Sequence, residues 1–168
     1  MRIQMGRDGP FGSEMEQTFE MASFTDVLRL DQLAVGSRFI LHPDVRGTTL
    51  MVRMMGVCLD FCLEHGVELL FGDCEPHLVR IYRGLGFRAY KALINHETSG
   101  VLVPLVLACN DLDHLVRVRS PLRTTLRAAR DKDVVSDTHY AGLLPTTEAI
   151  VSADPRDQKG SVRAVRHR

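Results

Sequence analysis

The chain has 168 residues, 45% of them hydrophobic and 25% charged, a composition that fits one globular domain with a short tail. Its 21 basic and 21 acidic residues cancel, so it lacks the basic excess that a nucleic-acid partner usually requires. No run of about 18 apolar residues is present, which excludes a membrane span, and no apolar stretch follows Arg2 as in a secretory signal. The four cysteines, without any sign of export, indicate reduced thiols and a cytoplasmic protein.

Residues 1–34 are predicted to be a poorly defined N-terminal lead-in. Glycine and proline between residues 6 and 12 interrupt any early element. The apolar residues after them are scattered and fit one or two short helices or a loop. The pattern becomes regular from residue 35 onward.

Residues 37–41 alternate and then turn apolar before His42-Pro43, which predicts a first strand. In residues 48–65 the polar side chains form one narrow stripe at steps of three and four, so a helix buried on most of its circumference is predicted, ending at Gly66. The apolar run 67–71 is predicted to be a buried strand.

Pro76 stands where a second helix would begin, with Glu75 as its cap, and Gly86 ends that helix. Residues 87–94 and 101–108 are predicted strands, and the turn residues between them imply an antiparallel hairpin. Pro104 requires a sheet edge or a bulge, and Asn110-Asp111 can cap a last short helix.

This order of elements predicts an α/β (α+β) fold, a mixed sheet with packed helices and at least one parallel strand pair. The charged segment 123–168 is predicted to be a polar, poorly ordered C-terminal tail with at most one short helix. Residues 35–122 would then form the core.

Cys58, Cys62 and His65 fall on one face of the predicted helix, a spacing that can hold a metal ion. Small apolar cysteines also fill a core face, and no fourth ligand stands at a recognisable spacing. We therefore predict no metal site.

The segment 39–50 joins a strand to a helix whose first backbone N–H groups are unpaired, which favours an anion. Arg46 adds charge, and Gly47 allows close approach of a ligand to the backbone. An ordinary turn before a helix fits these residues equally well.

Two segments carry a resemblance to a known family. His42-Pro43-Asp44-Val45-Arg46-Gly47 resembles the phosphate loop of the GCN5-related N-acyltransferase superfamily, and residues 78–88 (LVRIYRGLGFR) resemble its helix ending in Tyr-x-x-Leu-Gly-Phe. Ser37-Arg38-Phe39 is similar to acyl-homoserine-lactone synthases and long-chain N-acyl amino acid synthases, as are residues 103–107, 111–115 and Ser120-Pro121. The resemblance covers about residues 34–122, with a first half that is shorter than in the family.

The resemblance implies a site for an acyl thioester, with no permanently bound cofactor. The acyl donor would contact Phe39, Ile40, Leu41, Arg46, Gly47, Thr48 and Thr49. Tyr82 would protonate the departing thiol, and Asp73 and Glu75 would orient or deprotonate the amine.

Each of these residues also has a plain structural interpretation. Tyr82 can be a core aromatic with its hydroxyl tied to a neighbour, and the two carboxylates can cap the Pro76 helix. Arg38 can be an ion-pair partner or a substrate contact. Cys74 has no histidine partner in a recognisable arrangement, so direct transfer is favoured over an acyl-enzyme.

The expected function is an N-acyltransferase that moves an acyl chain from a carrier thioester to the amine of a small acceptor such as an amino acid. Thr49 and Met51 replace the usual loop glycines, which favours acyl carrier protein over coenzyme A as the donor. The candidate residues for meeting the acidic carrier are Arg46, Arg53, Arg80, Arg83 and Arg88.

Two alternatives remain, an acyl-homoserine-lactone synthase and a truncated, non-catalytic module that binds a carrier or partner. We also expect a homo-oligomer, because strand 37–41 would have at most one neighbour and an unpaired edge associates.

Overall fold

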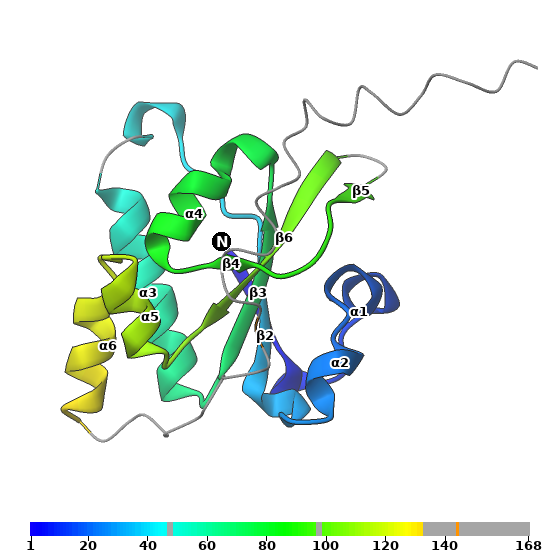
Figure 1. The fold of residues 1–168 in the computed structure, drawn as a ribbon, viewed down its shortest axis with the longest axis horizontal. Helices are drawn as coiled ribbons and strands as arrows, with labels where there is room; N and C mark the ends of the chain where they lie inside the picture. Colours follow the sequence, from blue (N-terminus) through cyan, green and yellow to red (C-terminus); the bar gives the residue numbers. More distant parts are fainter. Residues whose placement is uncertain (47–48, 97–98, 133–143, 145–168) are drawn as a thin grey trace, which may run out of the picture.

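The computed structural model describes residues 1–46, 49–96, 99–132 and 144. A mixed sheet separates α1 and α2 on one face from α3, α4, α5 and α6 on the other (Figure 1). The strands are β1 (Arg2–Met5), β2 (Leu33–Ser37), β3 (Leu69–Cys74), β4 (Arg88–Ala89), β5 (Ile94–His96) and β6 (Gly100–Ala108). Their order is β1-β2-β3-β6-β4, and β5 also pairs with β6.

The helices lie between and after these strands. They are α1 (Ser13–Phe19), α2 (Ala22–Thr25), α3 (Leu50–Glu64), α4 (Val79–Leu85), α5 (Leu112–Arg117) and α6 (Arg123–Arg130). Short 3₁₀ turns are η1 (Gly6–Asp8), η2 (Leu30–Gln32), η3 (Pro43–Val45) and η4 (Pro76–Leu78). Within the described ranges, none of these helices has the length and apolar content needed to cross a bilayer.

The pairing confirms the predicted mixed sheet. β2 and β3 are parallel, whereas β1 pairs antiparallel with β2 and β6 pairs antiparallel with β3, β4 and β5. The helix predicted over residues 48–65 is α3, and Gly86 ends α4 in the left-handed conformation as predicted.

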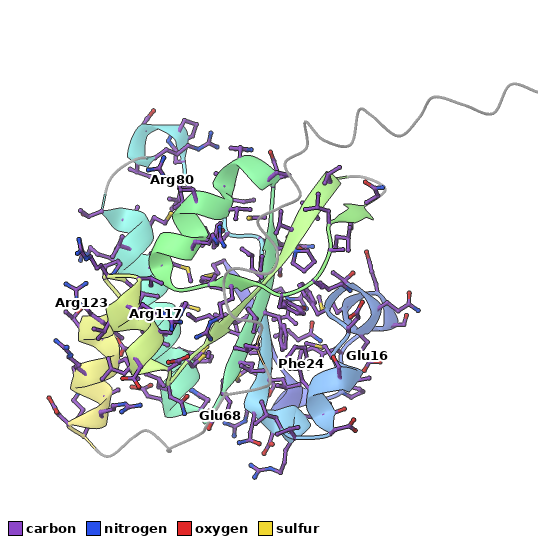
Figure 2. The ribbon with its side chains drawn as sticks, in the orientation of Figure 1. Glu16, Phe24, Glu68, Arg80, Arg117 and Arg123 are labelled. Carbon is purple, nitrogen blue, oxygen red and sulfur yellow. The ribbon has the colours of Figure 1, made fainter. Side chains whose placement is uncertain are left out.

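Two hydrophobic cores cover the two faces of the sheet. The larger core lies under α3 to α6 and includes Leu70, and the smaller core lies under α1 and α2 and includes Phe71. Figure 2 shows Phe24 between α2 and the sheet, where its ring packs edge-on against Phe71 with centroids 5.0 Å apart. Neighbouring residues of β3 thus point into opposite cores, as the pleat requires.

The predicted lead-in of residues 1–34 is in fact part of the fold. Arg2–Met5 is a sheet strand, and Phe11, Phe19 and Phe24 are buried in the smaller core. β1 has only four residues before η1 begins at Gly6, too few for an alternating pattern to be visible in the sequence.

The predicted strand 37–41 is misplaced. β2 ends at Ser37, because Arg38 has a left-handed backbone (φ 54°), and residues 39–41 continue outside the sheet. β2 therefore has β1 and β3 as its two neighbours. The argument for a homo-oligomer, which needed an unpaired edge on this strand, no longer holds.

The strand predicted over residues 87–94 is split into β4 and β5, which pair with different parts of β6. Pro104 lies in the middle of β6 and not at an edge, opposite Asp73 of β3. On the other edge of β6, the pairing with β5 ends at Leu102 and the pairing with β4 begins at Leu105, so Pro104 has no partner strand there among the described residues. A residue without an N–H is tolerated there because the ladder is interrupted.

The predicted start of the C-terminal tail, at residue 123, is wrong because a packed helix begins there. Residues 123–130 form α6, which packs against α3 through the buried side chains of Leu126 and Ala129. α3 in turn is less covered than predicted, since Val57 is 69% exposed. After α6, the structure describes residues 131–132 and Leu144 of the predicted tail, and Leu144 is buried in the smaller core.

Candidate active site

A pocket opens where β2 and β3 separate. The two strands pair from Leu33 with Leu69 to Val35 with Phe71 and then diverge. Gly72 lies close to the other strand at this point, since a Cβ on it would be 3.3 Å from the Gly36 carbonyl oxygen. The pocket has a volume of about 290 Å³, and its walls come from the ends of β2 and β3, from α4 and from β6.

The pocket brings together five of the predicted site residues, Phe39, Ile40, Asp73, Glu75 and Tyr82. Phe39 and Ile40 follow the last residues of β2. Among the residues that the structure describes, their backbone N–H groups have no acceptor. Two unpaired N–H groups beside a pocket are suitable donors to a carbonyl that gains negative charge.

Tyr82 reaches the pocket from α4. Its ring packs edge-on against Phe87, with centroids 5.4 Å apart, and within the described ranges its hydroxyl has no hydrogen-bond partner. Burial, reinforced by Cys74 and Asp73, raises the pKa of Tyr82, so the phenol keeps its proton at neutral pH. The contrast is Tyr90, whose hydroxyl donates to the Phe19 carbonyl at 2.8 Å.

Asp73 lies near the end of β3, at the open side of the pocket. Desolvation by the pocket walls raises the pKa of Asp73, and the nearby His96 opposes this shift. A raised pKa makes a carboxylate a better proton acceptor.

Glu75 follows β3 and occupies the cap position of η4, but its side chain makes no capping hydrogen bond. Instead its carboxylate lies 3.2 Å from Nδ1 of His77 at the surface. The capping interpretation is wrong for this side chain.

Cys74 lines the same pocket and is buried. Desolvation, with Asp73 and Glu75 nearby, raises the pKa of Cys74 to about 12. The group is a thiol at neutral pH and a poor nucleophile. This favours direct transfer, as the sequence predicts.

Arg38 also lines the pocket, at its exposed rim. No ion pair joins it to any carboxylate in the described part of the chain, so its structural interpretation finds no support. The rim therefore carries one positive charge from Arg38 and two negative charges from Asp73 and Glu75.

Three further residues of the predicted donor loop, Leu41, Arg46 and Thr49, do not line this pocket. The Leu41 carbonyl accepts a hydrogen bond from Nε of Arg46 at 3.2 Å, and Thr49 stands directly before α3. Gly47 and Thr48 lie outside the described residues.

The arginines suggested for carrier contact differ in accessibility. Arg46, Arg53 and Arg80 are exposed, and Arg83 is half-buried with contacts of its own. Arg88 is buried, with Nη2 2.5 Å from Oδ2 of Asp111. The prediction that Arg88 meets a carrier is wrong, because its charge is already paired inside the protein.

The suggested metal face of α3 holds no ligand cluster. Cys58 and Cys62 are buried, and Nδ1 of His65 lies 2.8 Å from the Phe61 carbonyl oxygen. Within the described ranges, no three His, Cys, Asp or Glu side chains are grouped as metal ligands.

Comparison with known proteins assigns the chain to a family. Residues 1–111 match the family model for FeeM, an N-acyl amino acid synthase. The chain belongs to the FeeM family. The match includes the N-terminal residues that the sequence alone left undefined, and it confirms the resemblance to long-chain N-acyl amino acid synthases. No curated protein sequence matches this chain significantly.

Solved structures share the FeeM-family fold. FeeM from uncultured soil microbes is 22% identical and matches over 62% of each chain with a TM-score of 0.53. Two CoA-dependent acyl-homoserine lactone synthases, BjaI with MTA and MesI, are 17% and 15% identical, each with a TM-score of 0.50. They cover 77% and 82% of this chain and 66% and 63% of their own. This chain thus spans less than two thirds of each relative.

The sequence did not predict several of the residues that line the pocket. Phe87, Leu102 and Leu105 line it, although they were expected only as strand residues. Phe87 follows Gly86 in the Leu-Gly-Phe motif, which was the one available signal. The contributions of β6 depend on a sheet order that no local pattern specifies.

Proposed function

We propose that this FeeM-family chain is an N-acyltransferase that moves an acyl group from a carrier thioester to the amine of an amino acid. The observation that carries the proposal is the pocket at the divergence of β2 and β3. There the backbone N–H groups of Phe39 and Ile40 and the hydroxyl of Tyr82, none of which has a hydrogen-bond partner in the described part of the chain, border one space. Acyl transfer requires a donor for the oxyanion and an acid for the leaving thiolate, and the pocket supplies both.

In this mechanism the acceptor amine attacks the thioester carbonyl directly. The ammonium group of the acceptor first loses one proton to solvent, and the neutral amine then attacks. Asp73 takes the second proton as the C–N bond forms and releases it to solvent, and the N–H groups of Phe39 and Ile40 stabilise the tetrahedral oxyanion. The C–S bond then breaks as the amide C–N bond is kept, and Tyr82 gives its proton to the departing sulfur. Tyr82 recovers a proton from solvent through the open rim of the pocket.

The charges at the rim support an amino acid as the acceptor. An α-amino acid carries one carboxylate and one ammonium group, and Arg38 matches the first while Asp73 and Glu75 match the second. An acyl-homoserine-lactone synthase is the second candidate, because two of the structural neighbours bear that name. Its product would be a lactone, so the two candidates differ in product.

For the donor we propose acyl carrier protein. Thr49 and Met51 replace the glycines that would let a loop approach a coenzyme A pyrophosphate closely. Arg46, Arg53 and Arg80 are exposed and could contact an acidic carrier surface.

The test supplies radiolabelled acyl groups on acyl carrier protein or on coenzyme A, with a pool of amino acids or with S-adenosylmethionine. The expected product is an N-acyl amino acid, formed faster from the carrier protein. A labelled lactone would support the second candidate, and faster turnover with coenzyme A would refute the choice of donor. No product from any pair, with carrier binding retained, would indicate the non-catalytic module.

A further inference from the structure

Three carbonyl groups in the last turn of α4, those of Tyr82, Arg83 and Leu85, accept hydrogen bonds from residues that follow the helix in the chain. The Tyr82 carbonyl accepts from the Phe87 N–H at 3.1 Å, and the Arg83 carbonyl accepts from the Gly86 N–H at 3.0 Å. These two bonds form the terminal loop that commonly follows a helix ending in glycine. The carbonyls of Leu85 and Gly86 are left without helical partners.

Side chains from α5 and from the segment after it form hydrogen bonds with the carbonyls of Leu85 and Gly86. Oγ of Ser120 donates to the Leu85 carbonyl at 2.6 Å, and Nε2 of His114 lies 3.0 Å from the Gly86 carbonyl. Both residues are buried. They come from the Asp-Leu-Asp-His-Leu and Ser-Pro motifs, whose role the proposed chemistry leaves unexplained.

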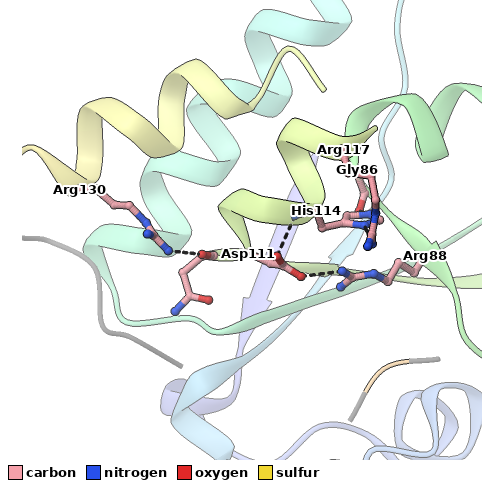
Figure 3. Close-up of polar contacts among 7 residues, drawn as sticks. Gly86, Arg88, Asp111, His114, Arg117 and Arg130 are labelled. Carbon is pink, nitrogen blue, oxygen red and sulfur yellow. Dashed lines mark hydrogen bonds and ion pairs between the residues drawn. The ribbon is translucent and has the colours of Figure 1, made fainter. Parts of the chain in front are cut away.

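The protonation of His114 follows from its second nitrogen. Nη2 of Arg117 lies 2.8 Å from Nδ1 of His114, and an arginine can only donate (Figure 3). Nδ1 therefore accepts, and the single ring proton sits on Nε2, where it is donated to Gly86.

Further contacts hold His114 itself in place. Oδ1 of Asp111 accepts the His114 backbone N–H at 2.9 Å, while Oδ2 of Asp111 pairs with Arg88 of β4 (Figure 3). The contact with α4 is also sterically tight. A Cβ on Gly86 would lie 2.3 Å from a methyl group of Leu115, and φ of Gly86 is 109°.

We propose that His114 and Ser120 are positioning residues that fix the last turn of α4 and, through it, the place of the Tyr82 hydroxyl in the pocket. Tyr82 begins the turn whose end these two side chains hold, and its ring packs on Phe87, the residue next to Gly86. The proposal rests on the proposed role of Tyr82. A misplaced acid slows proton transfer strongly while substrate binding is kept.

The variants for the test separate hydrogen bonding from packing. His114→Phe keeps a ring but loses the donor to Gly86, and His114→Gln keeps an N–H at a similar reach. Ser120→Ala removes one oxygen, and Ser120→Thr restores it. Val116→Ala, on the exposed side of α5, is the matched control.

The first readout is the Tyr82 phenol, followed by NMR in protein labelled with ¹³C on the tyrosine ring and assigned with Tyr82→Phe. We expect His114→Phe and Ser120→Ala to change its chemical shift and to move its titration toward that of free tyrosine. His114→Gln, Ser120→Thr and Val116→Ala should leave both unchanged. An unaltered Tyr82 signal in folded His114→Phe and Ser120→Ala would overturn the proposal, whether or not Tyr82 proves to be the acid.

The second readout is turnover. We expect kcat to fall about tenfold or more in His114→Phe, with KM nearly constant, and to fall no further when the change is added to Tyr82→Phe. If the double variant shows the full product of the two single reductions in kcat, His114 acts independently of Tyr82, and the proposal is overturned. If Tyr82→Phe alone leaves kcat intact, the acid in the proposed function fails, and the NMR comparison still decides the positioning role.

Discussion

Nη2 of Arg88 lies 2.5 Å from Oδ2 of Asp111, and this buried ion pair joins β4 to the N-cap residue of α5. The Arg88 side chain is only 8% exposed, against 20% for Asp111. A charge so placed depends on its partner, because removing one member leaves the other desolvated and unpaired.

We therefore expect Arg88→Met to lower the free energy of unfolding by about 3 kcal/mol. Arg80→Met, at an exposed position of α4, should change it by about 0.5 kcal/mol or less. Urea denaturation of both variants provides the measurement. A stable Arg88→Met protein with a raised KM for acyl carrier protein would instead mean that Arg88 does meet the carrier.

Tyr82 and Tyr90 form a matched pair for mutation. Tyr82→Phe should lower the single-turnover rate by about a hundredfold or more, because it removes the acid. It should change stability little, because the Tyr82 hydroxyl has no hydrogen-bond partner among the residues that the structure describes. Tyr90→Phe should cost about 1 kcal/mol of stability, because it loses the bond to Phe19, and should leave turnover intact. The opposite pattern would remove Tyr82 from the mechanism.

His114 gives stability a dependence on pH. Desolvation, supported by the charges of Arg88 and Arg117 and opposed by Asp111, lowers the pKa of His114 from 6.5 to about 4. Between these values the unfolded chain binds a proton that the folded protein excludes, so the free energy of unfolding decreases as the pH falls from 6.5 toward 4. The slope from this residue is up to about 1.4 kcal/mol per pH unit.

The measurement is urea denaturation of the unmodified protein and of His114→Gln at several pH values from 7 down to about 4, the range set by the two pKa values. The free energies of unfolding of the unmodified protein and of His114→Gln should become more similar as the pH falls, because only the unmodified protein loses stability through protonation of His114. Parallel curves would show that His114 is not held neutral.

The exposed arginines before α3 and on α4 should determine the affinity for an acyl carrier protein. Arg46→Glu and Arg80→Glu should each raise KM for acyl carrier protein about tenfold at low salt, with a smaller effect at high salt. Arg127→Glu is the control, because Arg127 is an exposed residue of α6. Figure 2 shows how far α6, marked there by Arg123, lies from Arg80 on α4. Equal effects of all three would argue against a defined docking surface.

Leu126 tests the revised boundary of the core. It is fully buried where α6 packs against α3, so Leu126→Ala should lower the free energy of unfolding by roughly 2–5 kcal/mol. Arg127→Ala, one residue further and exposed, should have little effect. If Leu126→Ala unfolds at the same denaturant concentration as the unmodified protein, α6 adds nothing to the core.

The sequence predicted the long and periodic elements well. The stripe of polar residues in α3 and the Pro76 and Gly86 boundaries of the second helix are local signals, and the structure has them where expected, apart from the exposed Val57. The sequence allowed one short helix in the tail but did not predict that α6 is packed in the core. Leu122, Leu126 and Ala129 follow a helical spacing, but the arginines around them resemble a solvated tail.

Other errors came from interactions that are distant in sequence. Arg38 ends β2 by a backbone conformation that its residue type does not predict. Arg88 is buried only because Asp111, 23 positions later, pairs with it. The family resemblance predicted Tyr82 and a backbone N–H from residues 39–41, and Asp73 was predicted from its position at the end of a strand. Which of the residues 39–41 border the pocket depends on where β2 and β3 diverge.

The alternation along β3 has a consequence for misfolding. Leu70 faces one core and Phe71 the other, and Asp73 lies further along the same strand. A slip of one residue against β6 would turn both apolar side chains to the wrong face and rotate the carboxylate away from the pocket rim. Chains that pair these strands incorrectly would therefore lose both stability and the proton acceptor together, so an abundant folded but inactive form with shifted strands is not expected.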